Sequence, residues 1–148
     1  MYARDEDEDL AQKELRRIDH LLFVTLKYTR TVDVIRSIIE KYINTINYKV
    51  EDYYRILFEK GKIKNIPPAP IMKIKQLEQI HPKDDTVKDI VDFYMMLKMT
   101  INAEYRSKEE YRKNVTLVTK DREINIATLK DYVEIVKEQV VYIDQLTQ

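Results

Sequence analysis

The two histidines are the residues of this chain whose type and spacing best suit metal chemistry. Glu78 precedes His81 by three positions, which is the Glu-x-x-His spacing of di-iron carboxylate bundles. Such a site takes two of these motifs and two further glutamates, yet the other histidine, His20, follows Arg17 at that spacing. Pro82 places His81 at a helix end. We therefore expect a surface histidine there, and neither a metal nor another cofactor.

His20 also belongs to a polar face. On a helical wheel Lys27 and Thr31 lie within about 20° of His20, while the local apolar stripe lies roughly opposite, near 170°. His20, Lys27 and Arg30 are therefore candidates for a polar site that a second subunit would complete. A solvated helix face is the simpler alternative.

Five lysines and no acid lie between residues 60 and 75. This basic, proline-stiffened connection has the composition of a contact with RNA, DNA or another phosphate. It equally suits pairing with the five consecutive acids at residues 5–9, in the same or a neighbouring chain. The lysines are Lys60, Lys62, Lys64, Lys73 and Lys75.

Nucleophilic and nucleotide-binding motifs are missing from the sequence. It contains no cysteine and a single glycine, which excludes thiol catalysis and the glycine-rich phosphate loops. Serine occurs only at Ser37 and Ser107, in no nucleophile motif. We therefore expect no catalytic residues and no enzyme of these classes.

A heptad pattern from Leu15 to Leu57 must position most of these candidates. Apolar residues repeat there at steps of three and four, as in helices that pack along a continuous seam. Phe23 and Val24 fall outside the apolar stripe and indicate a second covered surface. The predicted interface residues are Leu22, Phe23, Val24, Val32, Ile39, Ile43 and Ile46.

The pattern permits two arrangements of this segment. One is a single helix of roughly 65 Å at 1.5 Å per residue. The other is a pair of helices broken at residues 29–31, with Thr31 as the N-cap. Because no glycine or proline occurs before residue 61, we favour the long or kinked helix.

Breaker residues divide the remainder of the chain. Gly61 suits the position after a helix C-terminus, and three prolines between residues 67 and 70 predict a stiff connection. Pro70 is suited to opening a helix over 71–80. Asp84 or Asp85 then caps a helix that we expect to reach about residue 112, past a capping-box pattern at residues 107–110.

The spacing of apolar residues changes from helical to strand-like near the C-terminus. β-Branched runs at 115–119 and 123–126 flank a polar triplet, which predicts a β-hairpin. Thr128 with Asp131 is expected to cap a last helix.

The length and composition of the chain limit the class of protein to which it can belong. The 148 residues suit one domain, with an acidic tail at 1–9 and a proline-rich connection at 61–70. The 26 basic and 26 acidic residues cancel, so no net field attracts nucleic acid. Abundant isoleucine, lysine, glutamate and tyrosine, with no cysteine and few loop residues, are typical of a thermophile's intracellular protein. No long apolar run suggests a secretion signal or a membrane span, so we expect a cytoplasmic protein without membrane contact.

Two resemblances add to this interpretation. The segment from His20 to Ile35, HLLFVTLKYTRTVDVI, resembles the opening of an uncharacterised archaeal protein family of unknown function, which implies an archaeal origin. The layout is also similar to HEPN-type helical bundles, which often serve as RNA-cutting or toxin–antitoxin modules. Active members carry an arginine followed by histidine after four to six residues. Arg16 and Arg17 stand only four and three positions before His20, so this resemblance implies a fold and no catalytic site.

The sequence therefore predicts a mainly α protein: an elongated antiparallel bundle of roughly four or five helices with one small β-hairpin near 115–126. We expect a non-enzymatic structural or interaction module that forms a homodimer through its heptad-patterned helices. The alternative is a non-catalytic, HEPN-like RNA-binding protein that uses the segment from Lys60 to Lys75.

Overall fold

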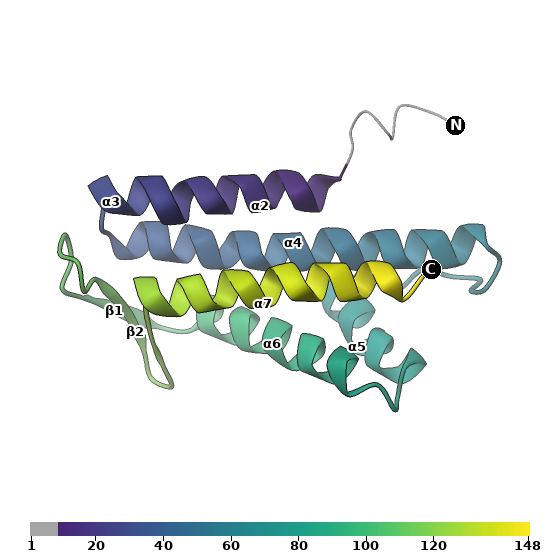
Figure 1. The fold of residues 1–148 in the computed structure, drawn as a ribbon. Coiled ribbons are helices and arrows are strands. Elements are labelled where there is room, and N and C mark those ends of the chain that lie inside the picture. The colour runs from purple at the N-terminus through teal and green to yellow at the C-terminus, as the bar shows by residue number, and fades with distance from the viewer. Residues whose placement is uncertain (1–8) are drawn as a thin grey trace.

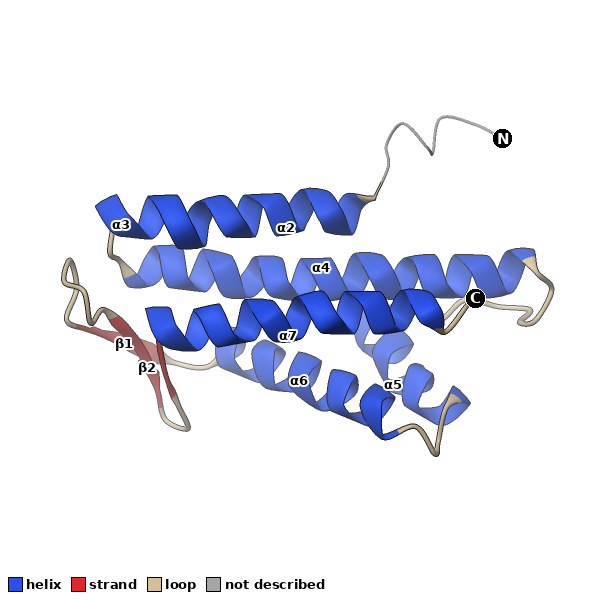
Figure 2. Cartoon of the chain, viewed as in Figure 1, coloured by secondary structure: helices blue, strands red, loops and turns tan. Residues whose placement is uncertain are grey.

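A computed structural model describes residues 9–148 of the chain. Five main helices form an elongated bundle with a small antiparallel sheet at one end (Figures 1 and 2). The sequence therefore predicts the fold class correctly. The predicted acidic tail lies outside the described residues except for Asp9. The elements are α2 (Leu10–His20), η1 (Leu21–Thr25), α3 (Leu26–Tyr28), α4 (Val32–Glu59), α5 (Pro70–Ile80), α6 (Asp85–Asn102), β1 (Tyr105–Lys108), β2 (Thr116–Thr119), β3 (Glu123–Asn125) and α7 (Ile126–Gln145).

The central helix is α4, which contacts α2, α6 and α7 along its length. The helical run from α2 through the π-helical η1 to α3 lies antiparallel to α4, and α7 lies beside both (Figure 1). The sheet sits where α3 ends and where α4 and α7 begin (Figure 1). This arrangement lets each helix bury its apolar stripe against α4.

The chain reverses direction at residues 29–31, so the prediction of one long helix is wrong and the two-helix alternative is confirmed. Thr31 is the N-cap, and its hydroxyl accepts a hydrogen bond from Val34 N (3.3 Å). A distant loop also holds the reversal: Tyr111 N donates to Arg30 O (2.7 Å), and the Glu110 carboxylate accepts from Val32 N (3.0 Å). The reversal therefore depends on partners that a local sequence window does not contain.

Folding back covers most of the heptad seam inside one chain. Five of the predicted interface residues are buried in the core, and only two lie on the surface. The buried ones are Leu22, Val32, Ile39, Ile43 and Ile46; the surface ones are Phe23 and Val24. The seam is thus covered by the packing of α2, α6 and α7 against α4.

The end of α4 and the start of α5 lie where glycine and proline predict them. Gly61 has a positive φ of 73°, and Gly61 N and Lys62 N donate back to Phe58 O (3.0 Å) and Leu57 O (2.9 Å). These two bonds form a Schellman motif, which requires a left-handed residue after the helix. Pro70 then occupies the first turn of α5.

The second half differs from the prediction in two places. The N-cap Asp84 accepts from Val87 N (3.0 Å) as predicted, but α6 ends at Asn102 rather than near residue 112. The capping-box pattern at 107–110 lies instead in β1 and the following turn. The predicted hairpin is confirmed as β2 and β3, and β1 adds a third strand beside β2. Asn125, and not Thr128, caps α7, since its side chain accepts from Thr128 N (2.9 Å).

Candidate anion-binding site

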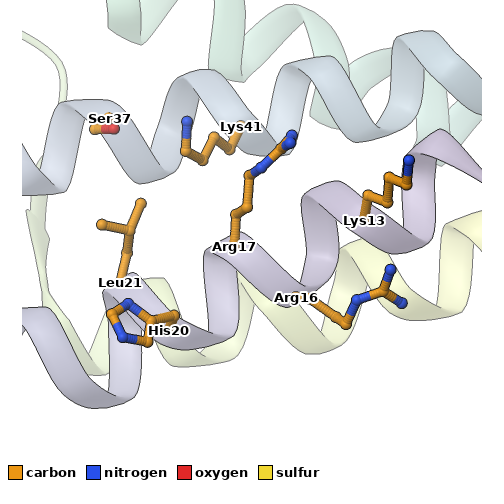
Figure 3. A pocket seen from close by; sticks show the side chains of 7 residues that line it. All are labelled: Lys13, Arg16, Arg17, His20, Leu21, Ser37 and Lys41. Atoms are coloured by element: carbon orange, nitrogen blue, oxygen red, sulfur yellow. The ribbon is translucent and has the colours of Figure 1, made fainter.

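A groove of about 750 Å³ lies between α2 and α4 (Figure 3). Its lining residues are mostly basic: Lys13, Arg16, Arg17, His20, Leu21, Ser37 and Lys41. None of these residues, all within the described part of the chain, is acidic. The groove therefore offers a cluster of nitrogen donors to a negatively charged ligand.

Helical spacing explains the cluster. Lys13, Arg17 and Leu21 follow one another at intervals of four along the flank of the helical run that faces α4. Residues four apart lie one above the other on a helix. Ser37 and Lys41 have the same spacing on the antiparallel α4, and Arg17 points toward Lys41 (Figure 3).

One groove cation is held by a buried carboxylate. Arg17 Nη1 donates to Glu14 Oε1 (2.8 Å), and Asn44 Nδ2 donates to Glu14 Oε2 (3.0 Å). The Glu14 side chain is buried, whereas that of Arg17 is largely exposed. Glu14 therefore fixes the position of the guanidinium while both of its own oxygens accept hydrogen bonds.

A second pocket of about 210 Å³ lies between the η1–α3 run and α7. Its floor is apolar and its rim is basic. The lining residues are Leu22, Phe23, Leu26 and Ile126 with Lys27, Arg30, Lys113 and Lys130. Lys130 Nζ lies 5.6 Å from the centroid of the Phe23 ring, within the range of a cation–π contact.

The structure separates the predicted polar face into two places. His20 lines the groove between α2 and α4, while Lys27 and Arg30 line the second pocket. The groove cations Lys13 and Lys41 are not among the predicted site residues. The sequence shows their spacing along each helix, but only the reversal at 29–31 brings the two helices together.

The five lysines between residues 60 and 75 lie apart from both openings. They follow the C-terminal end of α4 and enter α5. Lys60 Nζ donates to Thr147 O (3.1 Å), and Lys73 contributes its carbonyl oxygen to Tyr54 (2.6 Å). Lys62, Lys64 and Lys75 are exposed.

His81 has a neighbour that the sequence does not indicate. Its Nε2 lies 2.8 Å from Tyr53 Oη, and burial raises the pKa of Tyr53 to about 12. The contact joins the end of α5 to α4. Within residues 9–148 no three histidine, aspartate or glutamate side chains come together as a metal site.

Known proteins do not indicate the function of this chain. No protein-family model, curated protein or solved structure matches the chain. The archaeal and HEPN-type resemblances therefore stay predictions. Among the described helices, none has the length and apolar character needed to cross a bilayer.

Proposed function

We propose that this protein binds a polyanion, namely a nucleic acid strand, in the groove between α2 and α4. The observation that carries the proposal is the lining of that groove, which is basic on both helices and free of acidic residues among those described. Arginine and lysine are the residues that bind phosphate oxygens in such grooves.

The length of the groove favours a strand over a single phosphate ion. Lys13 and Leu21 are eight residues apart on one helical run, which corresponds to roughly 12 Å at 1.5 Å per residue. Successive phosphates of one strand can therefore contact successive turns. The Ser37 hydroxyl adds a neutral donor on the α4 side.

The segment from Lys60 to Lys75 is a separate candidate contact for RNA. Lys60 follows Lys41 by 19 positions along α4, or roughly 28 Å, so the two basic regions require separate tests. A strand long enough to follow α4 would contact both.

Titration of a fluorescent single-stranded RNA tests the groove. We expect the double substitution Arg16→Gln and Lys41→Gln to weaken binding about tenfold, which is about 1.4 kcal/mol. The slope of log affinity against log salt should also become shallower by roughly 1.4, because each phosphate contact on a single strand contributes about 0.7.

Lys62→Gln with Lys64→Gln is the matched control, because it removes the same charge at the far end of α4. Loss of binding in this control, with unchanged binding in the groove variant, would assign the RNA contact to the segment from Lys60 to Lys75. It would rule out the groove as the main site.

Self-association is the second candidate function, favoured by one observation. Phe23 and Val24 are adjacent large apolar residues with exposed fractions of 44% and 42%. A homodimer that packs through this pair would cover both side chains. The absence of cysteine fits a cytoplasmic location for either function.

A further inference from the structure

We infer that the pocket between η1, α3 and α7 holds a nucleobase of the strand whose phosphates lie in the α2–α4 groove. This inference rests on the function proposed above. It adds a specificity: the protein binds single-stranded nucleic acid, whose bases are free to turn outward, in preference to a duplex.

The floor of the pocket suits a flat, weakly polar ring. Leu22 and Leu26 are buried beneath it, and Ile126 closes it from α7. Phe23 lies at its edge with 44% of its surface exposed. An exposed aromatic ring beside a basic groove is the usual platform on which proteins stack bases without reading their sequence.

The rim of the pocket is positively charged. Within the described residues, none of Lys27, Arg30, Lys113 and Lys130 forms an ion pair with a carboxylate. By contrast, Lys137 on the same helix α7 pairs with Asp19 at 3.6 Å. Four such cations around an apolar floor complement a ligand with a ring and an attached phosphate.

The rim is also fixed by the fold. The turn that carries Arg30 is held by Tyr111 N, which donates to Arg30 O (2.7 Å). The same loop continues to Lys113. Two rim cations from distant parts of the chain are thus brought to one opening by the contact that sets the helix reversal.

The groove and the pocket flank the same helical run. Leu21 lines the groove, while the next two residues, Leu22 and Phe23, line the pocket. All three belong to η1, and π-helical turns occur frequently at functional sites. A strand that crosses η1 therefore reaches phosphate donors on one side and the aromatic platform on the other.

Other occupants fit the pocket less well. An apolar protein surface would bury the four rim cations without counter-charge, which is costly. An inorganic polyanion would contact the rim but leave the apolar floor uncovered. A nucleotide satisfies both parts at once.

Phe23→Leu separates base binding from phosphate binding. We expect this variant to bind oligoadenylate about tenfold more weakly and to bind inorganic polyphosphate, which has no bases, with unchanged affinity. The wild type should bind oligoadenylate more tightly than an RNA duplex at equal salt. Phe58→Leu is the matched control, because Phe58 is another exposed phenylalanine (50%) at the far end of α4, and its replacement should change neither affinity.

The outcomes distinguish the two proposals. Equal affinity of the Phe23→Leu variant and the wild type for oligoadenylate would overturn the base pocket while leaving the groove intact. If the wild type bound neither oligoadenylate nor polyphosphate, the proposed function itself would fail.

Methyl NMR gives an independent measurement that needs no variant. Adenosine monophosphate should shift the methyl signals of Leu26 and Ile126, whereas inorganic phosphate alone should not. Identical shifts with both ligands would mean that the pocket binds phosphate and no base.

Discussion

At the scale of single residues, Lys49 shows how this bundle holds a charge inside it. Its ammonium donates to Asp9 Oδ2 (2.8 Å) and to both carboxylate oxygens of Asp144 (3.0 Å). Burial alone would lower the pKa of Lys49 and raise that of Asp9, but their mutual hydrogen bonds and charges outweigh burial. The pKa of Lys49 is therefore raised and that of Asp9 lowered. The cluster ties the start of α2 and the end of α7 to α4.

Lys49→Met tests the contribution of this cluster to stability. We expect the free energy of unfolding at pH 7 to fall by about 1–2 kcal/mol. The loss stays modest because the Asp9 and Asp144 side chains are 34% and 47% exposed and water can solvate them. Urea denaturation measures the change. Lys88→Met is the control, since its partner Glu78 lies 3.9 Å away on the surface and its removal should have little effect.

The same cluster predicts a pH dependence with a definite sign. A carboxyl group whose pKa is lower in the folded chain stabilises the fold above its unfolded pKa of 3.8, and that stabilisation is lost as the pH falls through the folded value. The raised pKa of Lys49 acts below the unfolded value of 10.5 and is lost as the pH rises through the folded value. Unfolding free energies measured across the acid range should therefore fall more steeply below pH 4 for the wild type than for Lys49→Met. Parallel curves would show that the ion pairs contribute nothing.

At the scale of elements, the reversal at residues 29–31 decides the architecture. Thr31→Ala removes the side-chain acceptor for Val34 N and should cost about 1 kcal/mol, the usual effect of losing an N-cap. Thr29→Ala, at an exposed threonine of the same turn, should change stability little. Urea denaturation of both variants compares them. An equal effect of the two substitutions would mean that the loop at 110–111, and not the cap, fixes the start of α4.

Local signals predicted the elements whose ends depend on their own residues. Gly61, Pro70 and Asp84 mark the end of α4 and the starts of α5 and α6 because each acts through its own backbone or side chain. The reversal was predicted only as the alternative to a longer helix, and β1 was not predicted, since both depend on distant partners. Every residue of β1 is exposed, so the strand carries no alternation of polar and apolar residues, and its pairing with β2 is what defines it.

The candidate site was predictable only in part for the same reason. His20, Lys27, Arg30 and Phe23 were identified because they lie off the apolar stripe of their own helix. Lys41, Lys113 and Lys130 reach the two openings from other elements. A helical wheel of one segment contains no information about them.

At the scale of the whole molecule, the fold weakens the argument for a homodimer. The heptad seam is covered by the chain's own helices, so the pair Phe23 and Val24 is the part of the predicted interface that stays exposed. A stable interface buries about 800 Å² on each partner, far more than two side chains supply. A twofold dimer packed through this pair would also bring Lys27, a close neighbour on the same helical run, near its own copy.

We therefore expect a monomer, with a mass near 17.9 kDa and a radius of gyration somewhat above the roughly 15 Å of a compact chain of this length. Small-angle scattering with in-line mass, across a tenfold range of concentration, measures both quantities. Val24→Lys makes the result decisive, because Val24 lines neither the groove nor the pocket. A dimer that this substitution dissociates would establish self-association through the Phe23–Val24 pair. It would also require oligoadenylate to compete with the second subunit for Phe23, so that adding the oligonucleotide lowers the mass of the protein component.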